Sequence, residues 1–103
     1  MVSLCHCLDC QRRTGSTHGL AAFFSREAVV AEGRASRYRR IADSGRRVAF
    51  HFCPDCGTSV YWEPEARPDA IAVAVGCFAD PSFPPPAQSV WDDRRHPWLT
   101  CSI

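Results

Sequence analysis

Two short stretches decide how this chain folds: Cys5-His6-Cys7-Leu8-Asp9-Cys10 and Phe52-Cys53-Pro54-Asp55-Cys56-Gly57. Together they hold five of the seven cysteines in the sequence. Thiolates spaced one to three residues apart can converge on one ion, and C-x-x-C turns are typical of tetrahedral zinc sites, in which sulfur lies about 2.3 Å from the metal. The two stretches therefore predict a small domain whose cohesion depends largely on zinc.

The second stretch has the sequence of a zinc knuckle. Pro54 restricts one backbone angle, and Gly57 permits the left-handed turn that directs backbone N–H groups at the sulfurs. A knuckle supplies two ligands, here Cys53 and Cys56, so two more ligands must come from elsewhere. One alternative is a redox dithiol of the thioredoxin type, although the expected βαβ context is absent. Another alternative is a pair of inert buried cysteines.

The first stretch has two interpretations. Cys5, Cys7 and Cys10 could hold a catalytic or ligand-binding zinc whose fourth position is exchangeable. In the other interpretation, two of these three cysteines complete a single structural site with the cysteines of the knuckle. His6 lies between two cysteines, and adjacent residues seldom both bind one ion, so His6 is expected not to be a ligand.

Residues outside the two stretches add few candidates. Arg12 and Arg13 follow the first cluster and are candidates for binding a substrate carboxylate, with a solvated charged pair as the alternative. Cys77 lies in an apolar segment and is expected to be a small core residue.

Composition limits the class of protein. A length of 103 residues and a hydrophobic fraction of 46% predict one globular domain. A net charge of +1 gives no electrostatic argument for nucleic acid or a membrane as a partner. The first residues lack the features of a signal peptide, and the longest apolar run is about half the roughly 20 residues that a membrane span needs. We therefore expect a cytoplasmic protein, in which clustered cysteines are more often metal ligands than disulfides.

Short apolar or alternating segments separated by turn signals predict a mainly β domain. No segment shows a helical period over ten residues, and four prolines between residues 81 and 86 exclude regular structure there. The expected extended segments are residues 19–24, 29–30, 36–41, 47–52, 58–63, 71–75 and 90–91, with a turn at residues 43–45.

The two cysteine motifs, in this order, closely resemble those of the glutathione-dependent formaldehyde-activating family, which also includes centromere protein V. The resemblance covers the run from Cys5 to Gly15 and the run Phe52-Cys53-Pro54-Asp55-Cys56-Gly57-Thr58, with Cys53 lying 43 residues after Cys10. Further matches are residues 43–47, residues 76–81 and Pro97-Trp98. Nearly the whole chain is covered.

This resemblance implies a tent-like arrangement of small antiparallel sheets around zinc. It also implies carbon–sulfur lyase chemistry, in which formaldehyde and glutathione form S-hydroxymethylglutathione. The family pattern assigns Cys5, Cys7 and Cys10 to a catalytic zinc, and Cys53 and Cys56 to a structural zinc. An earlier C-x-C-G element completes the structural site in the family. We therefore expect residues 1–103 to form an N-terminally truncated domain, and its unpaired edge would favour a homodimer.

Three functions remain to be compared. The first is a zinc-dependent carbon–sulfur lyase-like protein acting on an adduct of glutathione or another small thiol. The second is a non-catalytic, zinc-stabilised binding module. The third is a thiol redox protein that forms a reversible disulfide between Cys53 and Cys56.

Overall fold

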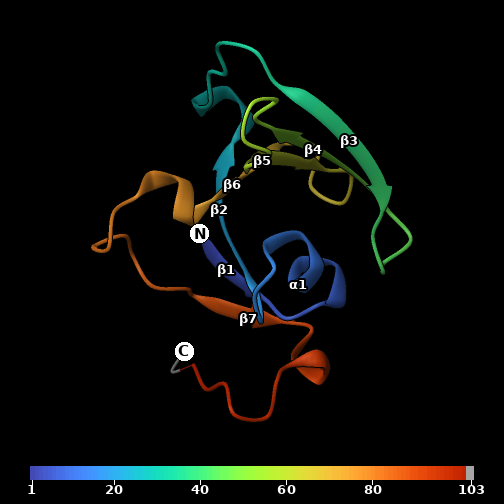
Figure 1. The fold of residues 1–103 in the computed structure, drawn as a ribbon, viewed down its shortest axis with the longest axis vertical. Coiled ribbons are helices and arrows are strands. Elements are labelled where there is room, and N and C mark those ends of the chain that lie inside the picture. Colours follow the sequence, from blue (N-terminus) through green and yellow to red (C-terminus); the bar gives the residue numbers. More distant parts are fainter. Residues whose placement is uncertain (102–103) are drawn as a thin grey trace.

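The computed structural model describes residues 1–101 and contains one seven-stranded sheet and one α-helix (Figure 1). The mainly β fold predicted from the sequence is confirmed. The elements, in chain order, are β1 (Val2–Cys5), α1 (Leu8–Thr14), β2 (Gly19–Ser25), β3 (Ser36–Ile41), β4 (Arg47–Phe52), β5 (Ser59–Pro64), β6 (Ala70–Ala74) and β7 (Gln88–Val90). Three 3₁₀ turns lie at Arg26–Ala28, Val75–Phe78 and Asp92–Arg94.

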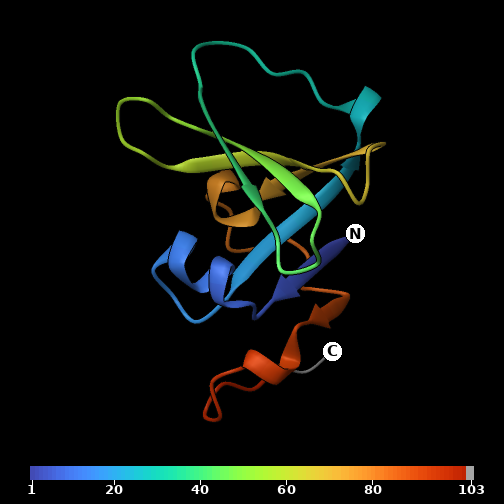
Figure 2. The same cartoon turned by 90° about the vertical axis from the view of Figure 1, so that its right-hand side faces the viewer.

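The strands join in a single sheet rather than in several small ones. Their order is β3-β4-β5-β6-β2-β1-β7, and every neighbouring pair is antiparallel except β1 with β7. In both views α1 lies between the β3–β5 end of the sheet and β7 (Figures 1 and 2). The helix therefore lies between strands that are far apart in the sequence, and none of its residues is buried.

The core lies where β2, β4, β5 and β6 meet. Its buried members are Ala21, Phe50, Trp62 and Ala72. Strand register brings them together, because Trp62 pairs with Phe50 on β4 and with Ala72 on β6. The rings of Phe50 and Trp62 lie 5.5 Å apart, and Ala72 is fully buried beside them. This cluster contains no cysteine, and the buried Cys7 lies outside it.

Two elements at the start of the chain were not predicted. The strand β1 has four residues and α1 has seven, which is too short for either period to show in the sequence. The helix instead depends on its ends. The Cys10 backbone N–H donates to Cys7 Sγ (3.3 Å), and Gly15 ends the helix in the left-handed conformation, at φ 65°.

Two smaller expectations were wrong. Residues 29–30 belong to no strand. Cys77 is exposed rather than in the core, because it lies in the 3₁₀ turn after β6, and its thiol donates to the Ser59 carbonyl (3.5 Å). Within residues 1–101, no helix is long and apolar enough to cross a membrane.

Candidate metal centre

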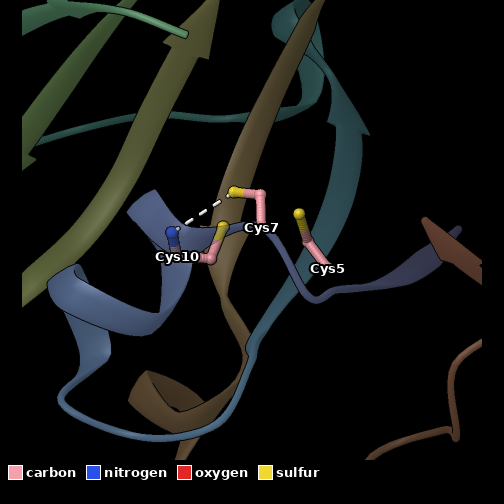
Figure 3. A group of neighbouring side chains, drawn as sticks. All are labelled: Cys5, Cys7 and Cys10. Carbon is pink, nitrogen blue, oxygen red and sulfur yellow. Dashed lines mark hydrogen bonds between the residues drawn. The ribbon is translucent and has the colours of Figure 1, made fainter. Parts of the chain in front are cut away.

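Three cysteines converge at the junction of β1 and α1. Cys5 ends the strand, Cys7 precedes the helix, and Cys10 lies in the first helical turn. Their sulfur atoms all lie within 4.8 Å of one another (Figure 3). Tetrahedral zinc with Zn–S bonds of about 2.3 Å holds its sulfurs about 3.8 Å apart. The three thiols therefore fit one zinc ion after small side-chain adjustments.

The two cysteine clusters do not merge. Among residues 1–101, the group of potential metal ligands contains Cys5, Cys7 and Cys10 but neither Cys53 nor Cys56. The interpretation in which two thiols of the first cluster complete a site with the knuckle is therefore not supported.

The pKa values of the three thiols are shifted in different directions. Hydrogen bonds from the Cys10 and Cys5 thiols hold the pKa of Cys7 well below its ordinary value. The pKa of Cys5 is raised, because its thiol donates to Cys10 and Cys7 and because it is partly desolvated. Hydrogen bonding among the three thiols therefore favours one thiolate within the cluster, which is the charge state that metal binding requires.

Arg13 lies directly beside the cluster. Its Nη2 donates to Cys10 Sγ (3.9 Å), and its guanidinium lies 4.3 Å from the Trp62 ring centroid and 5.6 Å from that of Phe50. Its Nε is buried without a hydrogen-bond partner among the described residues. The aromatic faces therefore position a positive charge beside the thiols.

Arg12 lies away from the cluster. Its side chain is 74% exposed and pairs with Asp9 Oδ1 (3.5 Å). Of the two arginines proposed from the sequence, the structure brings only Arg13 to the site.

Gly19 allows this close packing. It pairs with Cys5 across β1 and β2. A Cβ atom at Gly19 would lie 2.7 Å from Arg13 Nη2 and 3.2 Å from Cys10 Cβ. Any side chain at this position would therefore displace its neighbours, and no pattern in the sequence marks Gly19 for this role.

A long-range ion pair holds α1 against the sheet. Arg40 Nη1, on β3, lies 2.8 Å from Asp9 Oδ2, and the two side chains are 17% and 24% exposed. The Arg40 guanidinium also lies 4.8 Å from the centre of the Phe50 ring. No local pattern marks Arg40, because its partner lies 31 residues away.

A cavity of about 220 Å³ opens beside the thiols. The three cysteines and Arg13 line one part of it, and residues 42–44 and 46–48 of the β3–β4 hairpin line another. Trp62 and Trp91 also contribute. Trp91 has a φ of 56°, which is rare for a bulky residue, and it directly precedes the 3₁₀ turn at Asp92–Arg94.

His6 lies between two candidate ligands but is not part of the group. It is 1% exposed, and its backbone N–H donates to the Val90 carbonyl. Its Nε2 lies 3.9 Å from Asp92 Oδ1, and burial lowers its pKa. Its ring packs toward the C-terminal segment rather than binding with the thiols.

The knuckle turn connects β4 and β5. Two backbone hydrogen bonds close it, from Cys53 N–H to the Thr58 carbonyl (2.9 Å) and from Gly57 N–H to the Cys53 carbonyl (2.8 Å). Gly57 is left-handed as predicted, at φ 79°. Cys56 is exposed, and its hydrogen bond with the Thr58 hydroxyl (3.2 Å) lowers its pKa. The assignment of Cys53 and Cys56 as metal ligands stays a prediction.

Comparison with known proteins adds one result. A family model described as "Glutathione-dependent formaldehyde-activating enzyme" matches residues 1–94, a span that includes both cysteine clusters. No curated protein matches the chain.

Proposed function

Because the chain belongs to the glutathione-dependent formaldehyde-activating family, we propose that it is a zinc-dependent carbon–sulfur lyase-like enzyme acting on an adduct of glutathione or another small thiol. One observation carries this proposal: the three converging thiols line a cavity, Cys5 and Cys10 being half-buried and Cys7 buried. A structural zinc site is usually closed by four protein ligands, whereas a catalytic site keeps one position open. We place the activity in the cytoplasm, where small thiols are kept reduced.

Cys5, Cys7 and Cys10 would hold the zinc. Bound zinc would act as a Lewis acid, and its fourth coordination position would be open to a small thiol. Cys53 and Cys56 would provide two ligands to a second, structural zinc, with the remaining ligands coming from elsewhere.

The chain's own residues would then order the reactants. Formation of the adduct joins the thiol sulfur to the carbonyl carbon of formaldehyde, and the proton that the thiol gives up ends on the former carbonyl oxygen. The Arg13 guanidinium beside Cys10 offsets negative charge that develops in the cavity. The walls of the cavity reduce contact with bulk water, which strengthens this electrostatic effect.

A non-catalytic, zinc-stabilised module is the second candidate, and Cys7→Ser separates the two. A serine hydroxyl can still accept the hydrogen bond from Cys10 N–H that caps α1. The buried cluster formed by Ala21, Phe50, Trp62 and Ala72 also contains no cysteine, although Cys7 is itself buried. The catalytic proposal therefore predicts a folded variant that has lost zinc and thiol binding, whereas the module predicts unfolding.

The experiment combines three measurements on wild type and C7S. Circular dichroism reports the fold, elemental analysis reports zinc per chain, and exchange NMR reports the rate at which formaldehyde and glutathione interconvert with their adduct. Faster exchange with wild type, lost in a folded C7S, supports the proposal. No acceleration by zinc-loaded wild type would overturn it.

A further inference from the structure

Four arginines line the cavity, and two of them already have partners. Arg13 lies against aromatic rings and donates to Cys10 Sγ. Arg40 pairs with Asp9 at 2.8 Å. These two charges are occupied in holding the cysteine cluster and its helix in place.

Arg46 and Arg47 are the remaining two. Among residues 1–101, neither forms an ion pair, and both are exposed. The acidic residue of the cavity lining, Asp43, lies in the same turn and forms no ion pair either. This part of the lining therefore has a net charge of +1.

The turn that carries Arg46 is held by its own hydrogen bonds. Ala42 N–H donates to the Arg46 carbonyl (2.7 Å), and Gly45 N–H donates to the Ala42 carbonyl (2.8 Å). The Arg46 backbone N–H also donates to Ser44 Oγ (3.4 Å), and Gly45 adopts a φ of 85°. The backbone position of Arg46 at the cavity is thus defined before any ligand binds, which reduces the entropic cost of binding.

The cavity therefore presents two chemistries to one ligand. Its cysteine region suits a thiol, and its hairpin region offers guanidinium groups without a carboxylate partner. Guanidinium binds carboxylate through charge-assisted and often bidentate hydrogen bonds. A positively charged wall also raises the local concentration of anionic ligands.

We propose that Arg46, with Arg47 beside it, binds a carboxylate of the thiol substrate and so selects thiols that carry a carboxylate remote from sulfur. This inference rests on the proposed function. Arg46 lines the cavity but not the groove on the outer face of β3 and β4, whereas Arg47 borders both. Arg46 is therefore the more specific of the two to test.

The chain offers a matched control in Arg39. This residue lies on β3, is exposed and forms no ion pair among the described residues. It borders the outer groove and not the cavity. Arg39→Gln thus changes the net charge by the same amount as Arg46→Gln without touching the proposed site.

The experiment measures binding rather than turnover. Isothermal titration calorimetry of zinc-loaded protein compares glutathione with glutathione diethyl ester, which keeps the thiol and lacks both carboxylates. Wild type should bind the acid about 3- to 10-fold more tightly than the ester, a modest ratio because the arginines are exposed. R46Q should bring this ratio of affinities close to one, and R46K should retain part of the preference for the acid. R39Q should leave the ratio unchanged, and 0.5 M salt should reduce it in wild type.

The outcomes separate the inference from the proposed function. If wild type binds neither ligand, both fail. If wild type binds acid and ester equally, or if R46Q and R39Q lower the ratio to the same extent, the inference alone is overturned. Thermal melts show whether each variant is folded. If R46Q does not fold, the acid-to-ester affinity ratio of R46K tests the inference instead.

Discussion

Replacing Gly19 by alanine tests whether close packing behind the cysteines sets the metal site. The new Cβ would lie 3.2 Å from Cys10 Cβ, so Cys10 must retreat by about 0.2 Å to reach ordinary contact at 3.4 Å. A displacement of about 0.2 Å equals the tolerance of ligand distances in a metal site. The 2.7 Å contact with Arg13 Nη2 would also push the guanidinium away from Cys10 Sγ.

The expected loss lies in zinc affinity more than in stability. Disturbing groups that orient metal ligands typically weakens binding about 10- to 100-fold. Overpacking costs about 1–3 kcal/mol, and the lower entropy of an unfolded chain with alanine offsets about 0.4–1 kcal/mol of this. We therefore expect G19A to remain folded, with a free energy of unfolding lowered by at most about 2.6 kcal/mol.

The assay is titration with cobalt(II) followed by zinc competition, because tetrahedral thiolate coordination gives intense visible absorption. Gly76→Ala is the matched control, since an added Cβ there meets no atom within 4 Å and its backbone is not left-handed. G76A should bind both metals as wild type does. Wild-type zinc affinity in G19A would refute the argument that this contact positions Cys10.

Two further predictions concern groups outside the cavity. Hydrogen bonds from Arg26 and His51 lower the pKa of Glu63, so its contribution to stability is complete above pH 4.5 and is lost as pH falls through its folded-state pKa. In urea unfolding, E63Q should therefore be less stable than wild type at pH 6 and equally stable near pH 2. The difference at pH 6 should be no more than about 1 kcal/mol, because Glu63 is partly exposed. A difference in unfolding free energy that stays constant between the two pH values would contradict this prediction. In metal-free protein, iodoacetamide should alkylate Cys56 faster than Cys77, whose pKa is raised by partial desolvation although the residue is exposed, and Thr58→Val should slow Cys56 alone. The rates are measured by mass spectrometry of the alkylated peptides. Equal Cys56 rates in wild type and T58V would show that the Thr58 hydrogen bond does not control reactivity.

Local patterns explain how much of the fold could be predicted. The expected segments 36–41 and 47–52 coincide with β3 and β4, and the others that became strands are displaced by one or two residues at an end. Alternation, β-branched residues and turn signals act within a few residues, so they can be read directly. The parallel pairing of β1 with β7 joins distant positions such as Ser3 and Gln88, so no local sequence pattern predicts it.

The candidate site shows the same division between local and distant information. The three thiols could be recognised from the sequence, because cysteines at this close spacing are typical metal ligands. Arg40 and Gly19 were missed, because one acts through an ion pair that spans 31 residues and the other acts by lacking a side chain. Arg12 was overvalued, since adjacent positions on a helix point in different directions and only Arg13 reaches the cluster.

The way the cysteine cluster is attached favours a preorganised site over a metal-built fold. Strand β1 is held between β2 and β7, so Cys5 is placed by the sheet. The helix that carries Cys10 is tied to β3 through Asp9 and to the C-terminal segment through Gln11, whose Nε2 donates to the Arg94 carbonyl (3.1 Å). None of these contacts involves a sulfur atom. These contacts favour a cluster geometry set by the sheet, and we expect zinc bound to Cys5, Cys7 and Cys10 to add stability by mass action rather than to build this part of the fold.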